Sequence, residues 1–171
     1  MNLVLIGYRG TGKSVVSRRL AALLDRERIG MDETLVERFR ECVPEYVAKN
    51  GWDAFRDAES ELARELGARD GLVLDCGGGV IVRDQNIEAL RKNGRVVWLK
   101  ASVETIAKRI SGDTQRPSLT GQKSFLEEIE EVLMQRLPLY EKTSDFTVDT
   151  DSLSVEEVVG RILDWWKKAP P

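Results

Sequence analysis

The sequence contains no histidine and has two cysteines, Cys42 and Cys76, which lie far apart. The absence of histidine excludes Ser-His-Asp and Cys-His catalysis, histidine-ligated zinc and any imidazole general base. Two cysteines do not make the disulfide framework of a small secreted domain or a thiolate metal cluster. We therefore expect reduced, buried thiols, and chemistry that uses carboxylates, lysine, arginine, hydroxyls and backbone amides.

Long apolar runs and a large excess of charge of one sign are also missing. No segment reaches the about 18 apolar residues of a membrane helix, and the N-terminus lacks the pattern of a signal peptide. The 26 basic and 29 acidic residues are interspersed and sum to a net charge of -3, so no basic face indicates nucleic acid as a partner. We expect a cytoplasmic protein that binds neither membranes nor nucleic acid, with a monomer as its simplest state.

Short apolar runs alternate with longer stretches of helical periodicity along all 171 residues. This alternation is typical of parallel strands joined by crossover helices, and it predicts a single α/β domain over residues 1–171. The expected strands are Asn2–Ile6, Arg28–Met31, Leu72–Leu74, Val96–Leu99 and Phe146–Val148. The expected helices are Ser14–Asp25, Asp32–Phe39, Pro44–Lys49, Trp52–Leu66, Asp84–Lys92, Ser102–Ile110, Ser124–Leu137 and Ser154–Trp166.

Local signals mark several boundaries of these elements. Gly51 is expected to break the chain between two helices. The expected helices at Ser124 and Ser154 begin with capping boxes, Ser124-x-x-Glu127 and Ser154-x-x-Glu157. In a capping box, the serine side chain accepts a hydrogen bond from the backbone amide of the glutamate, and the glutamate side chain accepts one from the backbone amide of the serine. Residues 111–123 have one large apolar residue, two glycines and one proline, so we expect a mobile loop there.

The clearest motif is GYRGTGKS at Gly7–Ser14, which matches G-x-x-x-x-G-K-[ST] between an expected strand and an expected helix. Such a loop cradles phosphates, because its amides point inward and the helix N-terminus adds partial positive charge. Lys13 is expected to reach the β- and γ-phosphates, and the Ser14 hydroxyl to bind Mg²⁺. The motif predicts binding of ATP or GTP. The expected nucleotide-binding residues of this segment are Gly10, Thr11, Gly12, Lys13, Ser14 and Val15.

Three further features are expected near the carboxyl ends of the strands, where open α/β sheets bind ligands: Asp32, Arg56 and Gly77–Gly79. A carboxylate near the γ-phosphate can accept a hydroxyl proton, and an arginine can bind a substrate carboxylate through paired donors. A triple glycine lets a small ligand touch the backbone. Taken singly, each also fits a structural role, as a helix cap, a solvated charge or a turn.

Together with the phosphate loop, these features resemble the shikimate kinases over nearly all of the chain. The matching pieces, in order, are GYRGTGKS, Asp32 before a helix with Arg38, Ala54-Phe55-Arg56 followed by Glu59, Gly77–Gly79, Gln115-Arg116-Pro117 and Arg136-Leu137-Pro138-Leu139-Tyr140. Many enzymes share the phosphate loop, whereas the ordered set of the other pieces is much more selective.

The resemblance implies a three-layer P-loop kinase with a five-stranded parallel sheet and a lid at about 111–123. It implies transfer of the γ-phosphoryl group of ATP to the 3-hydroxyl of shikimate. The catalytic residues would be Lys13, Asp32 and Arg116, of which Asp32 takes the hydroxyl proton and Arg116 closes over the phosphates. Arg109 would stack on adenine. The shikimate-binding residues would be Asp32, Arg56, Gly77, Gly78, Gly79 and Arg136, and paired arginines suit a carboxylate because the guanidinium is planar.

One position departs from the family. Shikimate kinases usually have Asp-x-Asp after the second strand, and the first acid assists Mg²⁺ through water. Asp32 matches the second acid, which leaves Gly30 in place of the first. The third expected strand, Leu72–Leu74, is an apolar run that Asp75 follows directly. An apolar strand followed by an acid is the Walker B pattern of P-loop enzymes, in which the acid helps to hold Mg²⁺. We infer that Asp75 supports the metal with Ser14; alternatively, Asp75 only caps the glycine turn.

Two other functions remain open at this point. One is a kinase of the same fold with another acceptor, such as gluconate or a nucleoside monophosphate, and Gly30 keeps it open. The other is a nucleotide-dependent switch without catalysis, although Lys13, Ser14 and Asp32 supply the groups that phosphoryl transfer needs.

Overall fold

The structure, a computed structural model, describes residues 1–110 and 125–168, apart from the side chain of Phe125. The expected lid with Arg116 and the capping box at Ser124 lie outside the described residues. No helix among the described residues is both long enough and apolar enough to cross a membrane.

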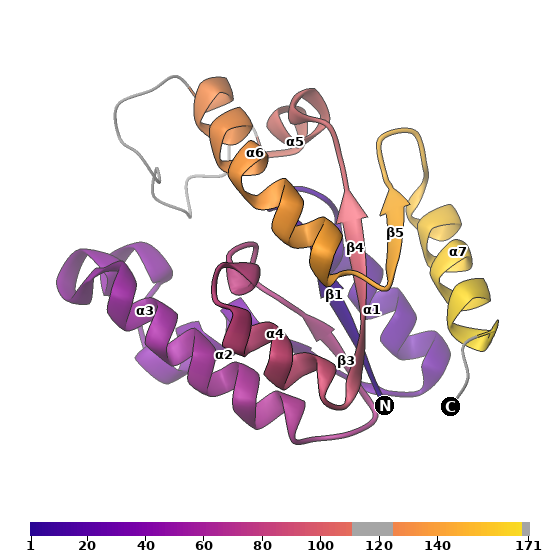
Figure 1. Cartoon of the computed structure of the whole chain (residues 1–171), viewed down its shortest axis with the longest axis horizontal. Helices are drawn as coiled ribbons and strands as arrows, with labels where there is room; N and C mark the ends of the chain where they lie inside the picture. Colours follow the sequence, from indigo (N-terminus) through magenta and orange to yellow (C-terminus); the bar gives the residue numbers. More distant parts are fainter. Residues whose placement is uncertain (111–124, 169–171) are drawn as a thin grey trace.

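Five parallel strands form one sheet in the order β2-β3-β1-β4-β5 (Figure 1). The strands are β1 Asn2–Ile6, β2 Glu27–Gly30, β3 Leu72–Asp75, β4 Gly94–Lys100 and β5 Phe146–Asp149. The helices are α1 Lys13–Leu24, α2 Met31–Phe39, α3 Val43–Gly67, α4 Asp84–Arg91, α5 Val103–Ile110, α6 Phe125–Thr143 and α7 Val155–Lys168, with a short 3-10 helix, η1, at Val80–Val82. The five-stranded parallel sheet predicted from the sequence is confirmed.

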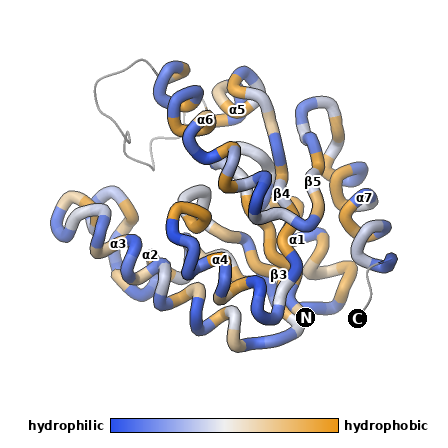
Figure 2. The backbone as a smooth tube through the Cα atoms, in the orientation of Figure 1, coloured by the Kyte–Doolittle hydropathy of each residue, from blue (hydrophilic) through white to orange (hydrophobic). Residues whose placement is uncertain are grey.

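The strands separate two hydrophobic cores because successive side chains of a strand point to opposite faces. In β1, Leu3 and Leu5 pack with residues of α1 and α7. Val4 and Ile6 pack with residues of α2, α3, α4 and α6 on the other face. Figure 2 shows hydrophobic and hydrophilic residues alternating along the helices, as expected for helices that bury one side. The result is a sheet between two helical layers.

Helix α3 joins the two helices that were expected on either side of Gly51. Gly51 has a φ of +84°, a left-handed conformation that glycine adopts without strain. With a ψ of 166°, Gly51 is not helical, so the break predicted at this glycine is confirmed as a kink between two helical segments. The capping box at Ser154 is confirmed, because the Ser154 N–H donates to Glu157 Oε2 at 2.8 Å and the Glu157 N–H donates to Ser154 Oγ at 3.3 Å.

Helix α6 continues to Thr143, whereas the sequence predicted its end at Leu137. Pro138 lies inside the helix and removes one backbone donor. Beyond it, Tyr140 is fully buried and its ring stacks on Trp98 of β4, with 5.5 Å between the ring centroids. We infer that this packing outweighs the cost of the proline and keeps the last turn helical.

Candidate active site

Two adjoining pockets lie at the carboxyl ends of the parallel strands. We call the first the acceptor pocket; it is lined by Tyr8, Arg9, Asp32, Val43, Trp52, Phe55, Arg56, Glu59, Gly77, Gly78, Gly79 and Arg136. We call the second the phosphate pocket; it is lined by Arg9, Gly10, Gly12, Lys13, Ser14, Val15, Gly30, Asp32, Glu33, Asp75 and Cys76. Arg9 and Asp32 line both, so the two pockets meet at these side chains.

The phosphate loop connects β1 to α1. Gly12, directly before α1, has a φ of +90°, which glycine adopts without strain. The Lys13 ammonium is buried and donates to the carbonyl oxygens of Gly7 at 2.9 Å and Tyr8 at 3.0 Å. Thr11 is also buried, and its hydroxyl donates to the Tyr8 carbonyl at 2.8 Å. Thr11 therefore stabilises the conformation of the loop and does not line the phosphate pocket. The other predicted nucleotide-binding residues of the loop do line this pocket.

Asp32 is the second residue of α2 and lies close to the glycine turn that follows β3. A Cβ built on Gly77 would lie 2.6 Å from Asp32 Oδ1 and 3.2 Å from Glu59 Oε1. A side chain at position 77 would therefore collide with the carboxylate at the junction of the pockets. The missing side chain of Gly77 makes room for Asp32.

Arg56 projects from α3 into the acceptor pocket and is held by a buried acid. Its Nη1 donates to Glu59 Oε2 at 2.7 Å, and the Glu59 side chain is 1% exposed. Burial raises the pKa of Glu59, and the charge of Arg56 opposes that rise. The Arg56 guanidinium also lies over the rings of Trp52 and Phe55, at 5.5 and 5.4 Å from their centroids. A Cβ on Gly79 would overlap this guanidinium, so Gly79 leaves space for it.

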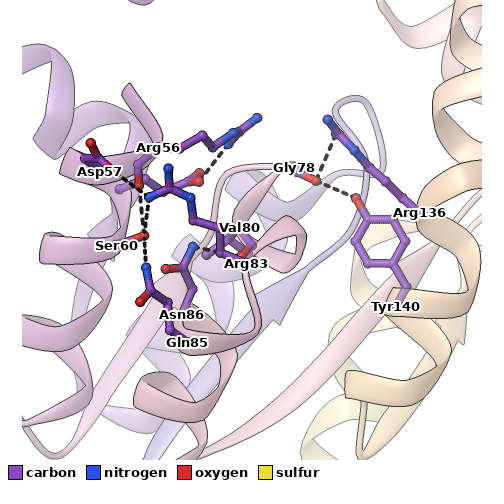
Figure 3. A network of polar contacts seen from close by, with 11 residues as sticks. Arg56, Asp57, Ser60, Gly78, Val80, Arg83, Gln85, Asn86, Arg136 and Tyr140 are labelled. Carbon is purple, nitrogen blue, oxygen red and sulfur yellow. Dashed lines mark hydrogen bonds and ion pairs between the residues drawn. The ribbon is translucent and has the colours of Figure 1, made fainter. Parts of the chain in front are cut away.

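Arg136 reaches the same glycine turn from α6. Its Nη1 donates to the Gly78 carbonyl at 3.1 Å, and the buried Tyr140 hydroxyl donates to the same oxygen at 2.7 Å. Figure 3 shows Arg56 and Arg136 on either side of Gly78, with Arg136 hydrogen-bonded to the Gly78 carbonyl. Two guanidinium groups converging on one pocket favour an anionic ligand with a planar acid group.

Asp75 lies at the end of β3, opposite Gly30 in the register of the sheet. Its side chain is 8% exposed, and its Oδ2 accepts a hydrogen bond from Arg28 Nη2 at 2.8 Å. In the described part of the chain, no hydrogen bond joins the Asp75 carboxylate to an amide of the glycine turn. The geometry thus gives no support to a capping role, and it places Asp75 on the phosphate pocket with Ser14.

Arg109 lies outside both pockets. Its guanidinium donates to Thr150 Oγ1 at 3.0 Å, to the Thr150 carbonyl at 2.8 Å and to the Gly10 carbonyl at 3.3 Å. These bonds tie the end of α5 to the phosphate loop and to the segment after β5. Stacking of Arg109 on adenine stays a prediction, as does the role of Arg116.

Several residues of the site were given no role from the sequence: Arg9, Arg28, Glu33, Trp52 and Glu59. Two of them carried a local signal. Glu59 follows Arg56 by three positions, a spacing that places both on one side of a helix. Arg28 precedes Gly30 by two positions in a strand, so both face the same side of the sheet. The other three lie close in sequence to predicted site residues, with Arg9 in the phosphate loop, Glu33 next to Asp32 and Trp52 four positions before Arg56, but no motif gave them a role.

The chain is similar to shikimate kinases over almost its whole length. A family model described as shikimate kinase matches residues 9–167. A shikimate kinase from Leptospira biflexa is 35% identical over 176 residues, covering 96% of this chain and 95% of that protein. One from Nitratidesulfovibrio vulgaris is 40% identical over 151 residues, covering 86% of each. The solved structure of shikimate kinase from Acinetobacter baumannii in complex with shikimate is 32% identical, with a TM-score of 0.91, and the match covers 99% of this chain and 95% of that chain.

Proposed function

The chain belongs to the shikimate kinase family, and from this premise we propose how its residues transfer the γ-phosphoryl group of ATP to the 3-hydroxyl of shikimate. The observation that carries the proposal is the position of Asp32, which lines both the acceptor pocket and the phosphate pocket. A carboxylate at that junction can accept the hydroxyl proton while the hydroxyl oxygen faces the γ-phosphorus.

Shikimate binds in the acceptor pocket. Arg56 and Arg136 bind its carboxylate, and the backbone of Gly77–Gly79 contacts the ring hydroxyls. The contact of Arg56 with buried Glu59 supports this assignment, because a guanidinium held at 2.7 Å by a fixed acid is already oriented before the substrate arrives.

ATP binds with its phosphates in the loop. The backbone amides of residues 10–15 hold the phosphates, and Lys13 exchanges its carbonyl partners for the β- and γ-phosphate oxygens. Arg109 contacts adenine, and Arg116 closes over the phosphates with the lid. The position of Lys13 supports this assignment, because its ammonium lines the phosphate pocket and can donate hydrogen bonds to phosphate oxygens there.

Mg²⁺ is the proposed metal. Ser14 and Asp75 fit it, because both line the phosphate pocket and offer the hard oxygen ligands that Mg²⁺ prefers. When bound, Mg²⁺ would neutralise negative charge on the phosphoryl group being transferred.

The step itself is an in-line displacement. The shikimate hydroxyl oxygen forms a bond to the γ-phosphorus, and its proton passes to Asp32. The bond between the γ-phosphorus and the bridging oxygen breaks, and ADP leaves with the electron pair. The products are shikimate 3-phosphate and ADP.

We propose that the enzyme works as a monomer on this small-molecule substrate, in the cytoplasm. Cys42 and Cys76 are both free thiols, as is usual in a reducing compartment; Cys76 is buried as expected, whereas Cys42 is only half-buried.

The test is an ADP-release assay with ATP, Mg²⁺ and one acceptor at a time: shikimate, gluconate or a nucleoside monophosphate. We expect turnover with shikimate and background release with the other two. Asp32→Asn, which keeps the size of the side chain, should lower turnover by about 100-fold or more, because a general base typically contributes that much. Release with gluconate but not with shikimate would overturn the assignment and leave the fold untouched.

A further inference from the structure

Gly30 leaves a space that a neighbouring carboxylate fills. A Cβ built on Gly30 would lie 2.6 Å from Glu33 Oε2 and 2.8 Å from Glu33 Cδ. The Glu33 carboxylate, in the first turn of α2, therefore occupies the place from which a side chain at position 30 would extend. Gly30 and Glu33 both line the phosphate pocket, together with Ser14 and Asp75.

Arg28 joins this carboxylate to Asp75. Its Nη1 donates to Glu33 Oε2 at 2.6 Å, and its Nη2 donates to Glu33 Oε1 at 3.1 Å and to Asp75 Oδ2 at 2.8 Å. Its Nε donates to Ser17 Oγ of α1 at 2.8 Å, which anchors the guanidinium from a third direction. The Arg28 side chain is 14% exposed, so its orientation is well constrained.

Arg28 pairs with both carboxylates, and Arg18 Nη2 also lies 3.6 Å from Glu33 Oε1, so two guanidinium groups balance the two acids, which both line the phosphate pocket. The hydrogen bond from Arg28 lowers the pKa of Glu33, so this acid is ionised at neutral pH. Its side chain is 53% exposed, so solvent and ligands reach it. Mg²⁺ in nucleotide sites is commonly held by one or two carboxylates and substrate phosphates, and it keeps several of its waters.

We propose that Glu33 takes the place of the acid missing at Gly30 and, with Asp75, supports the metal ion of the nucleotide complex. Support through metal-bound water does not need direct contact between carboxylate and ion. The inference rests on the proposed function, because it places Mg²⁺ and nucleotide in the phosphate pocket.

The first test measures Mn²⁺ affinity by electron paramagnetic resonance in the presence of saturating ADP, without shikimate and without turnover. Glu33→Gln and Asp75→Asn should each weaken Mn²⁺ binding by about 10-fold, the lower end of what is lost when an outer-shell partner of a metal site is removed. The matched control is Glu37→Gln, on the same helix but outside the phosphate pocket, which should bind Mn²⁺ as the wild type does.

A second test uses the space beside Gly30 that the Glu33 carboxylate occupies. Gly30 has an extended backbone, with φ of -90° and ψ of 116°, so an aspartate fits its conformation. Glu33→Ala removes the carboxylate that a Cβ at position 30 would meet. The double variant Glu33→Ala/Gly30→Asp should therefore recover most of the Mn²⁺ affinity that Glu33→Ala loses.

The outcomes separate this inference from the proposed function. Unchanged Mn²⁺ affinity in Glu33→Gln, or equal losses in Glu33→Gln and Glu37→Gln, would overturn the role of Glu33 even if shikimate-dependent turnover is normal. No ADP release with shikimate in the wild type would overturn the proposed acceptor, while the Mn²⁺ measurements would still decide whether Glu33 supports the metal. Thermal unfolding of each variant without metal shows that it is folded.

Discussion

Arg56 and Arg136 both line the acceptor pocket, but they differ in what holds them. Each should contribute a charge-assisted contact to the substrate carboxylate, so Arg56→Ala or Arg136→Ala should weaken shikimate binding by about 1.5–3 kcal/mol. ATP affinity should stay nearly constant in both variants. Isothermal titration with each ligand checks this, and equal losses for both ligands would show that the substitution had damaged the fold instead.

The two variants should differ in stability. Arg56→Ala leaves Glu59 buried without its ion-pair partner, and breaking one side of a buried pair typically costs about 3–5 kcal/mol. Arg136 donates to a carbonyl that Tyr140 also satisfies, so Arg136→Ala should cost much less. Urea denaturation measures the difference. Arg56→Ala/Glu59→Gln should recover stability without recovering shikimate binding, and a double variant as unstable as Arg56→Ala would contradict this account.

The same pair predicts a pH dependence. Burial raises the pKa of Glu59, and removing Arg56 takes away the charge that opposes the rise. A carboxyl whose pKa is higher in the folded state contributes stability below its unfolded pKa, and that contribution is lost as pH rises through the folded pKa. Arg56→Ala should therefore be least destabilised in acid and most destabilised at alkaline pH. Urea denaturation across pH should show this trend in Arg56→Ala and not in the double variant with Glu59→Gln.

At the scale of elements, the glycine turn after β3 is where three other elements meet. Asp32 of α2 fills the space beside Gly77, Arg56 of α3 fills the space beside Gly79, and Arg136 of α6 donates to Gly78. A second set of contacts, in which Arg83 and Gln85 donate to Ser60 Oγ at 3.3 and 3.1 Å, fastens the segment after the turn to α3 (Figure 3). The turn is thus the common wall of the acceptor pocket.

Alanine substitutions in this turn should separate binding from chemistry. Gly79→Ala pushes on the Arg56 guanidinium and should mainly raise KM for shikimate. Gly77→Ala pushes on the Asp32 carboxylate and should mainly lower kcat, because the base moves away from the acceptor hydroxyl. Steady-state kinetics of the two variants check the prediction. The same change in kcat and KM for both would mean that the turn moves as a whole.

At the scale of the whole molecule, both pockets lie at one end of a sheet whose two cores together include residues of all five strands. Ligands that bind the folded state should therefore stabilise the entire chain, which we expect to unfold as one domain. ADP or shikimate at 100 times its Kd should each add about 2.7 kcal/mol to the free energy of unfolding.

Thermal unfolding with each ligand measures this effect. At the same ligand concentration, Arg136→Ala should lose about half or more of the stabilisation by shikimate and keep the stabilisation by ADP. Two separate transitions, of which one responds to ligands, would contradict a single domain.

Much of this molecule follows from short-range pattern. Short continuous apolar runs indicate the strands, the phosphate loop between a strand and a helix indicates nucleotide chemistry, and Ser154 with Glu157 marks a helix start. Each of these signals works within a few neighbouring residues, where backbone geometry alone sets which side chains share a face. For that reason the five strands, the break at Gly51 and the phosphate loop could be predicted.

Contacts between distant elements could not be predicted in this way. Arg28 and Asp75 are 47 positions apart and meet because β2 and β3 are neighbours in the sheet. Helix α6 continues beyond Pro138 because Tyr140 packs on Trp98 of β4. The helix propensities of neighbouring residues do not predict this contact. Burial and packing of side chains from separate elements decide these arrangements, and only the folded chain brings those side chains together.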